Sequence, residues 1–198
     1  MKIAVDVDEI LANLIDPVIT FHNEQFQTAL VRDDFTSYNF DEVWGGTHLE
    51  AIQKVHQFFE TEHFRNIRPV AGAVEGVQKL KEKHDLFVVT SRQSVVEEQT
   101  KAWLNQHFPE MFKEIHVTNG FSLSGQKRLK KDVCKQVGAS LLIDDCLEYA
   151  LDCAAAGIPV VMLDYPWNQT KPGELPENVK RVFSWEEILR EIGKMMGE

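Results

Sequence analysis

Cysteine, long apolar runs and concentrated positive charge are all scarce in this sequence. Its three cysteines form no Cys-x-x-Cys pair, which argues against a disulfide-rich secreted scaffold and favours a reducing compartment. No apolar run approaches the roughly 18 residues of a membrane span, and no charged leader precedes an apolar stretch. We therefore expect a cytoplasmic protein with neither a membrane span nor a signal peptide.

Basic residues are outnumbered as well. The chain has 21 Lys and Arg against 31 Asp and Glu, which gives a formal net charge of −10 over 198 residues. An acidic surface repels polyanions, so a nucleic acid polymer is not an expected partner. A small phosphorylated substrate remains compatible, because a bound cation reverses the charge locally. The length suits one core with at most a small insertion, and it leaves the oligomeric state open, a homodimer included.

What the sequence does contain is an alternation of apolar strands and amphipathic helices. Five segments have the composition of short buried strands: residues 2–7, 86–90, 115–118, 141–143 and 159–163. Such near-continuous apolar strands indicate a parallel sheet that is covered on both faces. Ser184, with Glu187 three residues later, predicts the start of a final helix. The expected fold is α/β, a doubly wound parallel sheet of the Rossmann type.

One stretch interrupts this alternation. Residues 13–68 contain no second strand signal, and a break of about 55 residues is too long for a simple loop. We expect these residues to form a small helical cap inserted after the first strand, with residues 1–12 and 69–198 as the core. A crossover whose extra helices only pack on the core is the alternative. The segment is rich in aromatic residues, which either form the cap's own core or contact a substrate: Phe21, Phe26, Phe35, Tyr38, Phe40, Trp44, Phe58, Phe59 and Phe64.

Reactive side chains stand at the ends of the predicted strands. In chain order they are Asp6, Asp8, Thr90, Ser91, Arg92, Lys130 or Lys131, Asp144 and Asp145. Ligands of open parallel sheets bind at the carboxyl ends of the strands, so we expect these groups to meet at one edge. Residues 166–176 are the only stretch with the composition of a linker.

This set of groups is typical of phosphoryl transfer. A carboxylate can attack phosphorus and form an aspartyl phosphate, and a second acid can protonate the leaving oxygen and then deprotonate water. Clustered carboxylates repel one another unless a hard cation lies among them, and Mg²⁺ prefers a few carboxylates together with phosphate oxygens. A hydroxyl and an ammonium group can stabilise the phosphoryl oxygens. The sequence therefore predicts a magnesium-dependent phosphate monoester hydrolase.

The same residues resemble the motifs of the haloacid-dehalogenase superfamily of phosphohydrolases. Residues 5–11 resemble its first motif, residues 88–90 the second, one of the two adjacent lysines the third and residues 142–145 the fourth. The resemblance implies that Asp6 is the nucleophile and Asp8 the general acid/base. It implies that Thr90 binds the phosphoryl group and that Lys130 stabilises it. Asp144 would be a magnesium ligand and Asp145 a supporting acid near the metal. Asp6 and the carbonyl of Asp8 would complete the metal site.

Within the superfamily the sequence is most similar to the 5'(3')-deoxyribonucleotidase group and its bacterial relatives. The likeness rests on residues 8–12, 69–73, 90–92 and 166–168. It implies a nucleotide substrate, preferably a deoxynucleoside monophosphate. A small sugar or metabolite phosphate is the alternative, as is a catalytically silent binding or regulatory relative. Glu9 stands where many members of the superfamily carry glycine. Ser91 and Arg92 follow the second motif and could bind the substrate phosphate. The alternative is that Arg92 is exposed on a loop.

Overall fold

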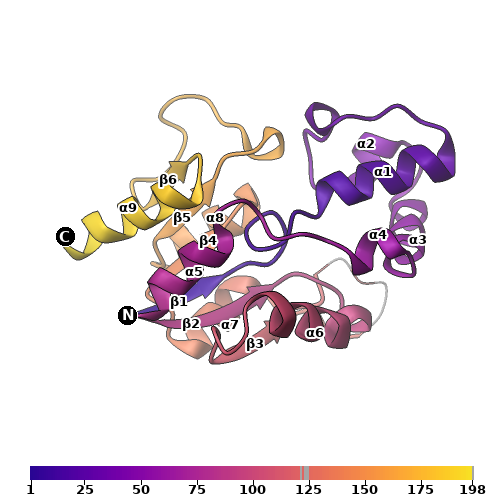
Figure 1. Ribbon diagram of the computed structural model, residues 1–198. Coiled ribbons are helices and arrows are strands. Elements are labelled where there is room, and N and C mark those ends of the chain that lie inside the picture. The colour runs from indigo at the N-terminus through magenta and orange to yellow at the C-terminus, as the bar shows by residue number, and fades with distance from the viewer. Residues whose placement is uncertain (121, 123–124, 198) are drawn as a thin grey trace.

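The computed structural model describes residues 1–120, 122 and 125–197, and it contains a six-stranded parallel sheet (Figure 1). The strands are β1 (Lys2–Val5), β2 (Asp85–Thr90), β3 (Glu114–Val117), β4 (Leu141–Asp144), β5 (Val160–Leu163) and β6 (Val179–Val182). Their order is β3-β2-β1-β4-β5-β6, and every neighbouring pair is parallel. This doubly wound order confirms the predicted fold. It places the point where the strand order reverses between β1 and β4.

Helices cover both faces of the sheet. Because side chains alternate along a strand, Ile3 and Val5 of β1 join one apolar cluster and Ala4 joins the other. The first cluster lies under α5 (Ala73–Lys81), α6 (Glu97–His107) and α9 (Trp185–Met196). The second lies under α7 (Lys130–Val137) and α8 (Leu147–Ala155). Burial on both faces explains why the four inner strands, β1, β2, β4 and β5, are mostly apolar.

Between β1 and β2 the chain forms further helices. They are α1 (Ile15–Phe26), the short helix η1 (Arg32–Asp34), α2 (Phe40–Trp44), α3 (His48–Phe59) and α4 (Glu62–Arg65). In Figure 1 helices α1–α4 lie together beyond the carboxyl ends of the strands, away from α5 and α9. The larger apolar cluster continues from the sheet into this group and includes Val18, Phe21 and Phe58. These helices fall within the predicted cap, residues 13–68, whose status as a separate domain stays a prediction.

The termini of the helices follow local sequence signals. Thr47 caps α3 through its side chain, which accepts a hydrogen bond from the amide of Glu50. Ser184 caps α9 in the predicted way, with its hydroxyl accepting from the amide of Glu187 at 3.2 Å. The Glu187 carboxylate, however, accepts from the amide of Phe183 at 2.9 Å, one residue before the expected donor.

Two expectations were wrong. The edge strand β6 was missed, because Lys180 and Arg181 at its centre break the apolar run by which the other strands were recognised. The stretch predicted as a linker begins with a short helix, η3 (Pro166–Asn168), in which Trp167 and Asn168 are buried.

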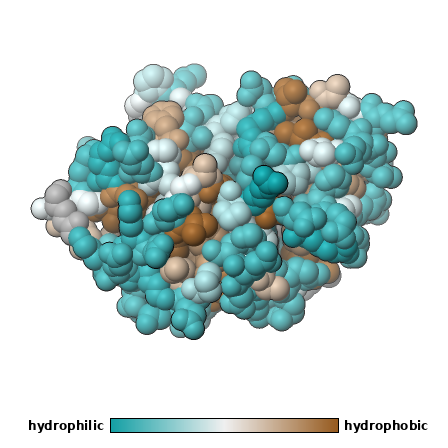
Figure 2. All heavy atoms as spheres, in the orientation of Figure 1, coloured by the Kyte–Doolittle hydropathy of each residue, from teal (hydrophilic) through white to brown (hydrophobic). Residues whose placement is uncertain are grey.

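One face of the molecule shows how hydrophilic and hydrophobic residues are distributed on the surface. In the face drawn in Figure 2, hydrophobic residues appear as separate patches among hydrophilic ones. Within the described part of the chain, no helix combines the length and the apolar run that crossing a bilayer requires.

Candidate active site

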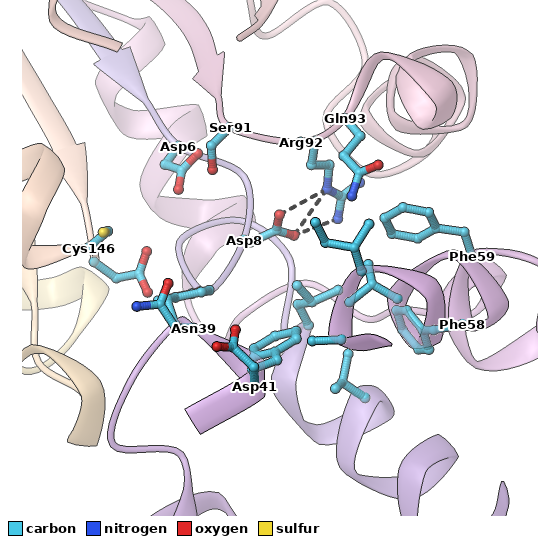
Figure 3. Close-up of a pocket in the computed structure, with 18 of the residues that line it drawn as sticks. Asp6, Asp8, Asn39, Asp41, Phe58, Phe59, Ser91, Arg92, Gln93 and Cys146 are labelled. Atoms are coloured by element: carbon cyan, nitrogen blue, oxygen red, sulfur yellow. Dashed lines mark hydrogen bonds and ion pairs between the residues drawn. The ribbon is translucent and has the colours of Figure 1, made fainter. Parts of the chain in front are cut away.

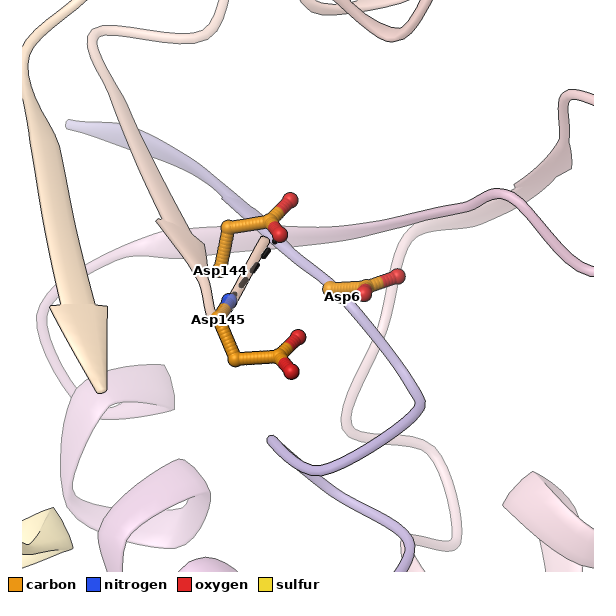
Figure 4. A group of neighbouring side chains, drawn as sticks. All are labelled: Asp6, Asp144 and Asp145. Atoms are coloured by element: carbon orange, nitrogen blue, oxygen red, sulfur yellow. Dashed lines mark hydrogen bonds between the residues drawn. The ribbon is translucent and has the colours of Figure 1, made fainter. Parts of the chain in front are cut away.

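Three carboxylates meet where β1 and β4 end. Asp6 follows β1, Asp144 ends β4 and Asp145 comes next, and one oxygen of each lies within 4.8 Å of the others (Figure 4). All three residues are buried. The amide of Asp6 donates to the carbonyl of Ile143 at 3.0 Å, which extends the pairing of the two strands up to the site.

Lys130 lies among these acids. Its Nζ is 2.7 Å from Asp144 Oδ2 and 3.1 Å from Asp6 Oδ1, and its side chain is 1% exposed. Burial alone would lower the pKa of Lys130, but the Asp144 and Asp6 carboxylates outweigh it and raise the pKa well above its ordinary value. Lys131 instead pairs with Asp152 at 3.1 Å. Neighbouring helical residues point about 100° apart, so only Lys130 reaches the acids.

The oxygens of the two adjacent aspartates are used differently. Asp144 Oδ1 accepts from the amides of Asp145 and Cys146, both at 2.9 Å, while its Oδ2 accepts from Lys130. Asp145 Oδ2 accepts from Trp167 Nε1 at 2.8 Å. Within the described chain Asp145 Oδ1 accepts no hydrogen bond, and neither does Asp6 Oδ1, whose contact with Lys130 is an ion pair without hydrogen-bond alignment.

Burial strongly perturbs the pKa values of Asp6 and Asp145. It raises the pKa of Asp6 to about 7, with Asp144 and Asp8 adding to the rise and Lys130 opposing it. Burial and then the neighbouring Asp144 raise the pKa of Asp145 well above its ordinary value. A nearby cation would favour the ionised forms. Two buried carboxylate oxygens without donors, on residues of one acidic cluster, are the kind of ligand set that fits Mg²⁺.

Asp8 points into the same site and is held by Arg92. The guanidinium donates to Asp8 Oδ1 from Nη2 at 2.7 Å and from Nε at 3.1 Å, as the dashed lines in Figure 3 show. Arg92 also donates to Thr100 Oγ1 at 3.1 Å and is only 7% exposed. The alternative of an arginine exposed on a loop is therefore wrong. Arg92 orients the second acid of the motif.

The predicted phosphate-binding hydroxyls occupy different positions. Thr90 ends β2 and is fully buried, and its Oγ1 accepts from the amide of Arg92 at 3.2 Å. Ser91 is half-buried and lines the pocket, whereas Thr90, Lys130 and Asp144 are not among the described residues that line it. Each of these three residues instead contacts one that does line the pocket: Thr90 contacts Arg92, Lys130 contacts Asp6 and Asp144 contacts Asp145.

A pocket extends from the acids to the cap. Its core wall includes Asp6, Asp8 and Asp145, and its cap wall comes mainly from α2 and α3, with Phe58 and Phe59 labelled in Figure 3. All nine aromatic residues of the cap belong to the larger apolar cluster or pack against it, and some also line the pocket. Those that line the pocket are Tyr38, Phe40, Phe58, Phe59 and Phe64. The others do not line it: Phe21, Phe26, Phe35 and Trp44.

The comparisons with known proteins agree on a family. The family model described as "5' nucleotidase, deoxy (Pyrimidine), cytosolic type C protein" matches residues 1–196. The chain belongs to this family. It is similar to a nucleotidase of Clostridium acetobutylicum, with 23% identity over 95% of this chain and 91% of that protein. It is also similar to a 5'(3')-deoxyribonucleotidase of Bacillus subtilis, with 23% identity over 96% of this chain and 97% of that one.

A solved structure supports the fold. A haloacid dehalogenase-like hydrolase of Streptococcus pneumoniae superposes with a TM-score of 0.72 at 11% identity, covering 96% of this chain and 97% of that one. This likeness shows a shared architecture. Together with the family match it identifies a phosphoric monoester hydrolase with a haloacid dehalogenase-like fold.

Several residues that hold this family site together were not assigned roles from the sequence. Trp167 fixes Asp145, and Asn168 Nδ2 donates to the Asp145 carbonyl at 2.7 Å. Both belong to the 166–168 motif, which follows the carboxyl end of β5. Because β5 pairs with β4, a motif at the end of β5 could have been expected to contact the acids at the end of β4. Sequence spacing alone could not show which oxygen each side chain would contact.

Glu9 is the second unassigned anchor. It is 1% exposed, and its backbone has a φ of 58°, a left-handed value that glycine adopts more readily than glutamate. Its Oε1 accepts from the amide of Ile15 at 2.6 Å and its Oε2 from Arg32 at 2.8 Å, while its carbonyl accepts from the Tyr165 hydroxyl at 2.9 Å. One side chain thus ties the loop after β1 to α1 and η1. We refer to Glu9, Arg32 and Tyr165 as the hinge cluster.

Proposed function

We propose that this chain is a magnesium-dependent nucleotidase that hydrolyses nucleoside monophosphates, deoxynucleotides in particular, through an aspartyl phosphate on Asp6. The observation that carries the proposal is the contact of Asp6 with the Lys130 ammonium at 3.1 Å and its grouping with the Asp145 carboxylate within 4.8 Å, with Asp8 lining the same pocket. Membership of a 5' nucleotidase family supports it, as does similarity to a 5'(3')-deoxyribonucleotidase.

The metal would be held by Asp6 and Asp145, with the predicted carbonyl of Asp8. Asp144 was the expected ligand and Asp145 the supporting acid, but both Asp144 oxygens already have donors and one Asp145 oxygen has none. The contacts therefore favour exchanging these two roles: Asp144 positions Lys130, and Asp145 binds the cation. Bound Mg²⁺ would supply positive charge beside the nucleophile and the phosphoryl oxygens.

The covalent step follows from the positions of the acids. An oxygen of Asp6 forms a bond to phosphorus as the ester P–O bond breaks, and Asp8 gives a proton to the leaving alcohol oxygen. Water then attacks phosphorus and loses a proton to Asp8, which breaks the P–O bond to Asp6 and releases inorganic phosphate. Arg92 holds the Asp8 carboxyl in place at 2.7 Å. Lys130 offsets charge on Asp6.

The cap wall supports a substrate with a planar, apolar part. Aromatic rings line the pocket opposite the acids, and stacking of a nucleobase on an aromatic face contributes about 1–3 kcal/mol. A sugar phosphate would make little use of such a wall, because it binds through hydroxyl groups.

A comparison of specificity constants tests the proposal. We expect kcat/KM for several deoxynucleoside monophosphates to exceed that for sugar phosphates by more than tenfold, about 1.4 kcal/mol of transition-state binding, and EDTA to abolish turnover. Brief reaction with labelled substrate should leave hydroxylamine-sensitive phosphate on Asp6. A preference for sugar phosphates would overturn the nucleotidase assignment, and full activity in EDTA would overturn the metal assignment.

A further inference from the structure

Among the described residues, few buried side-chain polar atoms lack a hydrogen-bond partner, and most of those that do lie at one place. They are Asp6 Oδ1, Asp145 Oδ1 and Tyr38 Oη, together with Trp44 Nε1 elsewhere in the cap. An unpaired buried polar group costs about 1–3 kcal/mol, so each needs an explanation. The two carboxylate oxygens are explained by a cation. The Tyr38 hydroxyl is not, because it comes from the cap and a neutral phenol donates a proton.

Tyr38 shares the pocket with the acids. It lines the same pocket as Asp6, Asp8 and Asp145, and its ring packs edge-on against Trp167, with ring centres 5.3 Å apart. Trp167 in turn holds Asp145. Burial, and then the charges of Asp145 and its neighbouring acids, raise the pKa of Tyr38 well above its ordinary value. The hydroxyl therefore keeps its proton.

We propose that Tyr38 is a phosphate-binding residue supplied by the cap, whose hydroxyl donates to an anionic oxygen of the phosphoryl group when substrate fills the pocket. The unpaired groups are complementary to such a ligand: two acceptors suit a cation, and one donor suits a phosphoryl oxygen bound to that cation. The inference rests on the proposed function and deepens it. It also links phosphate binding to the position of the cap, because Tyr38 precedes α2 while the acids belong to the core.

The chain offers a matched control in Tyr165. Its hydroxyl also lies partly buried near the acids, but it donates to the Glu9 carbonyl at 2.9 Å. Tyr38→Phe removes an unpaired hydroxyl and should leave Tm unchanged or slightly raised. Tyr165→Phe removes a formed hydrogen bond and should lower Tm by roughly 2–4 °C.

The experiment is titration calorimetry of inorganic phosphate with Mg²⁺ present, alongside kcat/KM and Tm for the wild type and both variants. We expect Tyr38→Phe to weaken phosphate binding by roughly ten- to a hundredfold, the effect of a hydrogen bond to a charged group, and to lower kcat/KM at least as much. Wild-type phosphate affinity in Tyr38→Phe would overturn the inference. So would an affinity loss accompanied by a Tm drop like that of Tyr165→Phe, since the role would then be structural.

Failure of the proposed function gives a different result. If the wild type binds phosphate but hydrolyses no monoester, the nucleotidase proposal fails, and the phosphate affinities still decide the role of Tyr38. If the wild type does not bind phosphate at all, the inference about Tyr38 is overturned as well.

Discussion

The two walls of the pocket differ in character. The core wall carries Asp6, Asp8 and Asp145, whose carboxyl groups are contacted by Lys130, Arg92 and Trp167 respectively. The cap wall is mainly apolar, and its rings contact one another. Charge placed at strand ends suits the phosphoryl group that all substrates share, whereas apolar rings suit the part in which substrates differ. Changes in the core wall should therefore affect turnover of every substrate, and changes in the cap wall should affect the choice among them.

The largest effect should come from Asp6→Asn. An amide is a poor nucleophile, so we expect turnover to fall by about 10⁴-fold or more on every substrate. The fold should persist, because asparagine has nearly the same shape and removes one charge from a repelling cluster. The measurement is kcat on a deoxynucleoside monophosphate and on glycerol phosphate. Asp85→Asn, an exposed acid at the opposite end of β2, is the control, and comparable activity in the two variants would contradict the assignment.

The next largest effect separates adjacent lysines. Lys130→Met leaves Asp6 and Asp144 buried without their shared cation, so activity should fall by about 10²–10³-fold. The free energy of unfolding should fall by about 3 kcal/mol. Lys131→Met removes only the partly exposed pair with Asp152, and it should change stability by less than about 1 kcal/mol. Kinetics and denaturant unfolding of both variants would check this, and the reverse order would move the assignment by one residue.

The core wall was largely predictable, for a physical reason. In a parallel sheet buried on both faces, strands are nearly all apolar, so a polar group at a strand end is conspicuous. Topology then brings Asp6 and Asp144 together without further information. Sequence spacing favoured Lys130 over Lys131 but could not decide between them. The decision depends on how α7, which begins at Lys130, is oriented relative to the acids.

The contacts that hold the site were not predictable in this way. Glu9 and Trp167 contact partners that are distant in the sequence, and no periodic pattern reports which oxygen receives which donor. The cap's aromatic residues presented the same difficulty. Helical spacing showed that they would be shielded, but the same spacing serves for Phe21 in the apolar cluster and for Phe59 at the pocket.

A smaller effect should appear at the boundary between the walls. Arg32→Met in the hinge cluster leaves the Glu9 carboxylate, 1% exposed, without its cation, and should destabilise the protein by about 2–3 kcal/mol. Because Glu9 also caps the start of α1, hydrogen exchange should speed up in α1 more than in β1 or β4. Arg65→Met, which removes an exposed pair with Glu62, is the control. Uniform acceleration across core and cap would mean that the hinge cluster is not a local tie.

The smallest effect tests the cap wall alone. Phe59 is half-buried and lines the pocket, so Phe59→Leu keeps an apolar side chain while removing the aromatic face. Loss of stacking should lower kcat/KM for a deoxynucleoside monophosphate by about five- to thirtyfold, or about 1–2 kcal/mol. It should leave kcat/KM for glycerol phosphate, which has no ring, nearly unchanged. Phe26→Leu makes the same substitution at a cap aromatic that packs within the apolar cluster, so it should lower stability without changing the ratio of the two specificity constants. An equal loss of kcat/KM on both substrates in Phe59→Leu would show that the ring supports the acids. The core wall and the cap wall would then not have separate roles in turnover and in substrate choice.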